Sequence, residues 1–183
     1  MIAITFGIQL AKVQTARAAV VPYTIDVHNG TNILYFLFAR DRVSGDITDL
    51  GGGVKKNEYS LIAALREFRE ESDEIFGTLY ERVNDLTTNI ALLGDNMSVL
   101  FIPVKWEWYK KAPDLFKEKK KSPHFQFKRS HNEVSELLWF NENEFQQLIS
   151  PKNKQMWTRI RKFYQCGFDT NLKAALKMVY TCY

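Results

Sequence analysis

The sequence predicts an α+β fold, in which a mixed sheet is flanked by helices as an α/β/α sandwich and a helical extension follows at the C-terminus. Three observations predict it. Short runs rich in β-forming residues fill much of the chain, one amphipathic helical pattern interrupts them, and several helical patterns close it. Such an order is typical of a sheet covered by helices. The length of 183 residues and the 45% hydrophobic content suit one domain with a real core.

The elements are expected in the following order. Ranges 18–27 and 32–41 are rich in β-forming residues, and Asn29-Gly30 between them is a strong hairpin signal. Apolar residues then recur at helical spacing: Leu61, Ala64, Leu65 and Phe68. Further strands are predicted over 89–94, 98–109 and 133–140. A long loop is predicted over 110–132, which holds two prolines and many lysines. Helices are expected over 141–150, 153–165 and 170–180.

The net charge of +4 is unevenly distributed along the chain. Range 105–129 has nine Lys or Arg and three Asp or Glu, and range 151–183 has seven and one. Each therefore carries +6, and the remainder carries −8. We expect a main domain over 1–150, with 151–183 as a basic helical segment packed on it. The asymmetry predicts a polyanionic partner, although solvated lysine faces are the alternative.

Composition also bears on the cellular setting. No run approaches the roughly 20 apolar residues that a membrane helix needs, so no membrane partner is expected. The two cysteines, Cys166 and Cys182, match no zinc or redox spacing and indicate free thiols in a reducing compartment. We therefore expect a cytoplasmic or nuclear protein.

Three glutamates crowd one side of the helix that follows the glycine-rich turn. Glu67, Glu70 and Glu71 stand at i, i+3 and i+4, so their side chains point to one side, away from the apolar stripe. Their mutual repulsion would be relieved by a divalent cation, and hard oxygen ligands suit Mg²⁺ or Mn²⁺. The alternative is a solvated acidic face in which Arg66 and Arg69 are the partners.

The segment from Gly52 onward resembles the Nudix box, Gly-x5-Glu-x7-Arg-Glu-U-x-Glu-Glu-x-Gly-U, where U is aliphatic or aromatic. Seven residues match it at the correct spacing: Gly52, Glu58, Arg66, Glu67, Phe68, Glu70 and Glu71. The last two positions depart from the pattern, because Asp73 stands where the family has glycine and Glu74 where it has a hydrophobic residue. We expect this departure to affect the exit of the helix more than the chemistry.

The resemblance implies a Nudix fold and a hydrolase that cleaves a diphosphate joined to some other group. It implies that Glu67, Glu70 and Glu71 bind Mg²⁺ or Mn²⁺, with Glu70 also serving the catalytic step. Arg66 would hold a carboxylate in place, and Glu58 would be a supporting acid. Gly52 would let the backbone turn tightly into the box. Metals in such sites bridge phosphate oxygens and activate a water molecule.

A general base outside the box is also expected. Asn132-Glu133-Val134, followed by Trp139-Phe140, is similar to the sequence around the proposed base of mRNA-decapping Nudix proteins. This similarity favours Glu133 as the base or as an additional metal ligand, with Glu136 as second choice. Alternatively, Glu133 merely ends a strand and the two aromatic residues belong to the core.

Basic and aromatic residues near Glu133 bear on the substrate. Cationic strips bind phosphate backbones and aromatic side chains stack on bases, although most aromatic residues pack in cores. The candidate substrate-binding residues are Trp106, Trp108, Lys119, Lys120, Lys121, Lys128 and Arg129. Capped RNA is the leading substrate, with release of m7GDP and a 5′-monophosphate RNA. The alternatives are diphosphoinositol polyphosphates, dinucleoside polyphosphates or a non-catalytic binding module, against which the intact glutamates argue.

Overall fold

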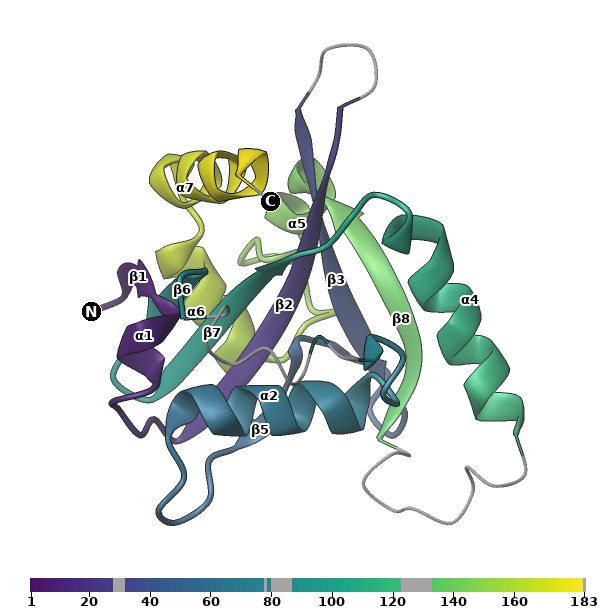
Figure 1. The fold of residues 1–183 in the computed structure, drawn as a ribbon, viewed down its shortest axis with the longest axis horizontal. Helices are drawn as coiled ribbons and strands as arrows, with labels where there is room; N and C mark the ends of the chain where they lie inside the picture. The colour runs from purple at the N-terminus through teal and green to yellow at the C-terminus, as the bar shows by residue number, and fades with distance from the viewer. Residues whose placement is uncertain (28–31, 78, 80–86, 123–132, 183) are drawn as a thin grey trace.

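The computed structural model describes residues 1–27, 32–77, 79, 87–122 and 133–182. Within them lies one mixed sheet with helices on both faces (Figure 1). The strands are β1 (Ala3–Phe6), β2 (Arg17–Asp26), β3 (Ile33–Asp41), β4 (Ile47–Thr48), β5 (Leu50–Gly53), β6 (Ile90–Leu93), β7 (Met97–Pro103) and β8 (Val134–Asn141). The helices are α1 (Gly7–Leu10), α2 (Ser60–Glu71), α4 (Trp108–Lys121), α5 (Glu142–Leu148), α6 (Thr158–Gly167) and α7 (Thr170–Thr181).

The sheet topology places the glycine-rich strand β5 beside β2 and the start of β8 beside the end of β3. Strand β2 runs parallel to β7, and its other edge pairs antiparallel with β3 and with β5. Strand β8 pairs antiparallel with β3, and the register places Val134 opposite Asp41. Glu133, the residue before β8, therefore lies at the same end of the sheet as the β3–β4 turn.

Two apolar layers cover the two faces of the sheet. One layer, under α2 and α4, includes Leu61, Phe68 and Phe116. The other, under α5, α6 and α7, includes Phe145 and Leu172. In Figure 1, α2 crosses in front of the strands and α4 runs alongside β8. The predicted mixed sheet flanked by helices is confirmed, and the C-terminal helices complete one of its two cores.

The long loop predicted over 110–132 is wrong for its first half, because α4 continues to Lys121. The strand expected over 98–109 correspondingly ends at Pro103. Ala112 and Phe116, four residues apart, are both buried against the sheet. Tertiary burial of one helix face outweighs the unfavourable Pro113 in the helix interior.

Other differences concern short or boundary elements. The pattern missed β1, α1, β4 and β5, which have two to four residues each and leave little periodicity to detect. The helix expected over 153–165 begins later, at Thr158. The Asn29-Gly30 turn and range 123–132 lie outside the described residues. Among the helices that the structure describes, none is long and apolar enough to cross a membrane.

Candidate active site

The glycine-rich strand β5 packs tightly against both β2 and α2. A Cβ atom on Gly52 would lie 2.5 Å from the carboxyl carbon of Glu67, and one on Gly51 would lie 2.2 Å from the Cβ of Ala19. Non-bonded carbon atoms ordinarily approach no closer than about 3.5 Å. Glycine is therefore needed for space at position 51, whereas at position 52 it determines how closely β5 approaches the Glu67 carboxylate.

Arg66 connects the carboxylates of the box to one another. Its Nε and Nη2 atoms donate to the two oxygens of Glu58, each at 2.9 Å, and Nη1 donates to Glu67. Nη2 also donates to the carbonyl oxygen of Gly53 at 3.0 Å. The bond from Arg66 holds the pKa of Glu58 below its ordinary value, against a smaller opposing effect of burial. Arg66 thus occupies the place of a residue that orients carboxylates.

Glu71 is the buried member of the three glutamates on α2. Its Oε2 accepts a hydrogen bond of 2.6 Å from the backbone N–H of Gly51. Burial raises the pKa of Glu71 well above its ordinary value, opposed by the charge of Arg17 and reinforced by Asp49 and Glu67. Glu71 is therefore fixed in direction by the peptide of Gly51 and keeps a high proton affinity.

Glu133 lies within electrostatic reach of two carboxylates of α2, those of Glu67 and Glu70. Its pKa is raised by partial burial and then by the negative charges of Glu67, Asp41 and Glu70. Charges perturb a pKa strongly only over short distances, so the exposed Glu133 shares a region of negative potential with the α2 glutamates. Glu136 instead pairs with Arg40 at 3.1 Å on the surface. Glu133 is thus influenced by the α2 glutamates, whereas Glu136 is engaged by Arg40.

The glutamates of α2 and Glu133 are the candidate ligands of a divalent cation. Within the described ranges, no three His, Cys, Asp or Glu side chains already lie close enough to hold a metal ion. The Glu67 carboxylate is turned toward Arg66, and that of Glu71 toward Gly51. The donors nevertheless fit a hard divalent cation, because burial and, to a smaller extent, the charge of Glu67 raise the pKa of both Glu71 and Glu133, and a cation would relieve that repulsion. Residues Glu67, Glu70, Glu71 and Glu133 would hold it.

The two departures from the Nudix pattern preserve the helix exit. Asp73 and Glu74 have φ angles of 56° and 59°, the left-handed conformation for which the family's glycine is suited. Asp is one of the residues that adopt it with least difficulty. The buried Asp73 carboxylate lies 3.0 Å from Nζ of Lys120, and Lys119 Nζ donates to the Asp73 carbonyl oxygen at 2.5 Å. The exit turn is thereby joined to α4.

The candidate substrate-binding residues are found in different surroundings. Trp108 packs its ring 4.7 Å from that of Phe76, within the layer under α4. Trp106 stacks on Tyr109, with centroids 4.7 Å apart and planes 8° from parallel. Lys121 is exposed. Range 128–129, which holds the candidates Lys128 and Arg129, lies outside the described residues.

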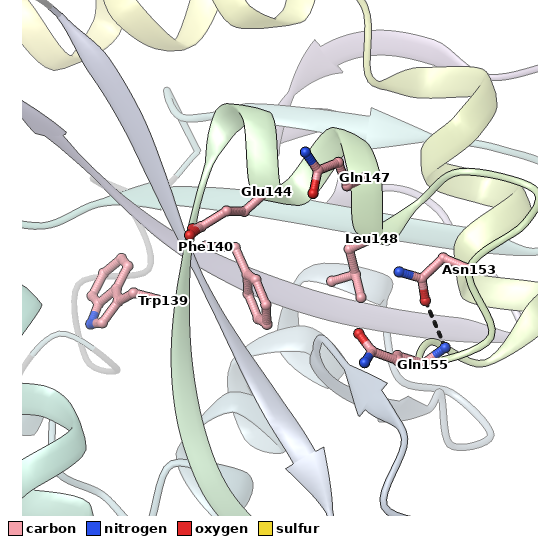
Figure 2. A pocket seen from close by; sticks show the side chains of 7 residues that line it. All are labelled: Trp139, Phe140, Glu144, Gln147, Leu148, Asn153 and Gln155. Carbon is pink, nitrogen blue, oxygen red and sulfur yellow. Dashed lines mark hydrogen bonds between the residues drawn. The ribbon is translucent and has the colours of Figure 1, made fainter.

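A pocket of about 250 Å³ lies between the second half of β8 and α5 (Figure 2). It is lined by Trp139, Phe140, Glu144, Gln147, Leu148, Asn153 and Gln155. At about 3.3 Å per strand residue, Trp139 is about 20 Å along β8 from Glu133. None of Glu67, Glu70, Glu71 and Glu133 lines this pocket, and Trp139 and Phe140 belong to its surroundings.

Sequence reasoning missed two residues that lie behind the site, Arg17 and Tyr164. Arg17 forms an ion pair of 2.6 Å with Asp49, and the hydroxyl of Tyr164 donates to the same carboxylate at 2.7 Å. Neither residue stands in a motif, since Arg17 begins a strand and Tyr164 fits an ordinary helical core pattern. Only the spatial arrangement identifies them.

Comparisons with known proteins were made by sequence and by structure. No family model and no curated protein matches the chain. Among solved structures, a binary complex of the C. elegans Ap4A hydrolase is similar over 86% of this chain and 98% of that one, with 16% identity and a TM-score of 0.48. A mutT/nudix family protein from Listeria innocua covers 87% and 96%, with 13% identity and a TM-score of 0.44. A further structure of the C. elegans Ap4A hydrolase covers 85% and 92%, with 14% identity and a TM-score of 0.39.

All three TM-scores are below 0.5, so the geometry of the residues at the box positions is considered instead. Gly52 approaches Glu67, Arg66 joins Glu58 to Glu67, and Glu67 and Glu70 of α2 lie within electrostatic reach of Glu133. The segment from Gly52 to Glu71 that resembles the Nudix box therefore begins on strand β5 and ends on helix α2.

Proposed function

We propose that this chain is a Mg²⁺- or Mn²⁺-dependent Nudix hydrolase that cleaves a diphosphate linkage. The observation that carries the proposal is that Glu133 lies within electrostatic reach of Glu67 and Glu70, which stand on a different element and whose charges, after partial burial, raise its pKa. Perturbed acids gathered with a second acidic element are typical of functional sites. An ordinary solvated helix face would not need an opposing acid from the end of another strand.

Each residue of the site has its own role in the proposed reaction. Once bound, a divalent cation supplies charge neutralisation on the phosphate oxygens and a water molecule of lowered pKa. Arg66 keeps Glu67 in place, and the Gly51 peptide keeps Glu71 in place. Glu133, whose proton affinity is raised, is suited to accept the proton of the attacking water.

The cationic rim beside α2 bears on the substrate. Lys119 and Lys120 both contact Asp73 at the end of the box, and the charge of Arg42 is close enough to lower the pKa of Lys120, after the larger effect of burial. These cations lie at the end of α2, close to its glutamates. Their positive charges suit a polyanion longer than a single diphosphate. We therefore propose a 5′–5′ polyphosphate bridge between two nucleosides as the substrate, with capped RNA as its leading source and a dinucleoside polyphosphate as the alternative.

A panel of three substrates tests this proposal. Cap-labelled RNA, a dinucleoside tetraphosphate and a diphosphoinositol polyphosphate would each be incubated with the protein and Mn²⁺. We expect release of m7GDP from capped RNA by the wild type and by Glu107→Gln, an exposed glutamate immediately before α4, but not by Glu70→Gln.

The panel also separates the alternatives. A faster reaction on capped RNA than on a free cap dinucleotide supports RNA as the source of the bridge, and equal rates assign the dinucleoside polyphosphate. Cleavage of the diphosphoinositol substrate alone would overturn the nucleotide assignment. Inactivity on every diphosphate would refute the hydrolase and favour a binding module.

A further inference from the structure

We infer that Tyr164 on α6 is a positioning residue for Glu71, acting through Asp49, Arg17 and the peptide of Gly51. The inference rests on the proposed function in one respect, since it takes Glu71 as a metal ligand. It goes beyond the box, because it assigns a role in the site to the C-terminal helical segment.

A continuous series of short contacts joins the two residues. The hydroxyl of Tyr164 donates to Oδ2 of Asp49 at 2.7 Å, and Oδ1 of Asp49 lies 2.6 Å from Nη1 of Arg17. This second contact is a close ion pair rather than a well-aligned hydrogen bond. Nη2 of Arg17 donates to the carbonyl oxygen of Gly51 at 2.6 Å. The N–H of Gly51 donates to Oε2 of Glu71, also at 2.6 Å.

The peptide of Gly51 has little freedom to move. Its Cα lies so close to β2 that an added Cβ would be 2.5 Å from the carbonyl oxygen of Ala18. Its carbonyl oxygen is fixed by Arg17 and its N–H by Glu71. The N–H and the C=O of Gly51 belong to two successive peptide planes, and the pairing of β5 with β2 restrains both of them. A displacement of Arg17 is therefore expected to reach Glu71 through this paired backbone.

The burial of Tyr164, Asp49 and Arg17 indicates that their contacts orient the neighbouring groups more than they stabilise the fold. The side chain of Asp49 is 0% exposed and that of Arg17 is 11% exposed, and Tyr164 is fully buried. Removing a charge pair from water costs about as much as the pair returns, and apolar residues of similar size are often at least as stable. A buried ion pair with a tyrosyl hydroxyl is thus best explained by what it orients.

Two conservative variants separate a positioning role from a merely structural one. Tyr164→Phe removes only the hydroxyl that holds Asp49. Tyr23→Phe is the matched control, because Tyr23 is equally buried in the same core and donates to the backbone oxygen of Leu176 at 3.1 Å. Neither substitution changes the ring, so both variants are expected to fold, which a urea unfolding curve verifies.

Mn²⁺ binding without substrate, measured by calorimetry, is the main readout. We expect Tyr164→Phe to bind Mn²⁺ about tenfold more weakly than the wild type, at the low end of the effect of outer-shell partners. Tyr23→Phe should bind as the wild type does. In steady-state kinetics at a fixed, subsaturating Mn²⁺ concentration, Tyr164→Phe should lower kcat and leave the KM for substrate unchanged.

A double-mutant cycle completes the test. If Tyr164 acts through Glu71, its substitution should have no further effect on Mn²⁺ affinity in a Glu71→Gln background. Mn²⁺ affinity within twofold of wild type in Tyr164→Phe, or equal weakening in Tyr23→Phe, overturns the inference. Failure of the proposed function is distinguishable, because it would appear as inactivity of the wild-type chain on every diphosphate, which is measured separately from Mn²⁺ affinity.

Discussion

Replacing Gly52 with alanine tests whether the position of the Glu67 carboxylate matters for catalysis. The added Cβ would lie 2.5 Å from the Glu67 carboxyl carbon and 2.6 and 2.7 Å from its oxygens. To reach the 3.4 Å of ordinary contact, the carboxylate must retreat by about 0.9 Å. A displacement of about 1 Å at a catalytic group can lower the rate about 100-fold, which corresponds to about 2.7 kcal/mol of barrier.

The same substitution should leave stability nearly unchanged. The atoms that must move are the far end of a flexible side chain, and alanine reduces the freedom of the unfolded chain. We therefore expect the free energy of unfolding to change by less than about 1 kcal/mol. Gly53→Ala is the matched control, because its Cβ would meet no atom within 4 Å.

The assay combines initial rates of Mn²⁺-dependent hydrolysis with urea unfolding. The reasoning predicts a large loss of rate in Gly52→Ala only, at preserved stability. Wild-type rates in Gly52→Ala would refute it, and so would an equal loss in Gly53→Ala.

Two further predictions concern the surroundings of the box. Lys120→Met removes the positive charge that lies 3.0 Å from the buried Asp73 carboxylate and should lower the free energy of unfolding by about 3 kcal/mol. The control Lys121→Met, at an exposed position, should change it by less than about 0.5 kcal/mol. Equal effects in urea unfolding would argue against a stabilising ion pair between Lys120 and Asp73. Asp41→Asn removes one of the charges that raise the pKa of Glu133, so Glu133 should ionise at lower pH. The acidic limb of the kcat/KM profile should then move to lower pH, and an unmoved limb would count against Glu133 as the base.

Local patterns predicted the parts of the site that lie close together in the sequence. Glu67, Glu70 and Glu71 share a helix face because of their spacing, and the structure shows them on α2 with Arg66 between its acidic partners. The short similarity around Glu133 also indicated an acid that the structure brings within electrostatic reach of α2. Both inferences depend on neighbours within a few residues.

Tertiary arrangement determined what the sequence could not reveal. Helix α4 was missed because lysines and Pro113 outweigh its apolar face in a local pattern, whereas burial of Phe116 decides its conformation. Arg17 and Tyr164 were missed because 147 positions separate them and Asp49 joins them only in space. Asp73 departs from the motif, yet its backbone keeps the left-handed turn.

The central claim is that the glutamates of α2 bind a divalent cation that is needed to cleave a diphosphate. The most direct measurement is the rate of hydrolysis of capped RNA or a dinucleoside tetraphosphate against Mn²⁺ concentration, for wild type and Glu70→Gln. We predict no reaction in EDTA, a saturable rise with Mn²⁺, and a rate lower by about 100-fold or more in Glu70→Gln, since metal catalysis supplies several kcal/mol. Hydrolysis that persists in EDTA, or that is unchanged in Glu70→Gln, would contradict the claim.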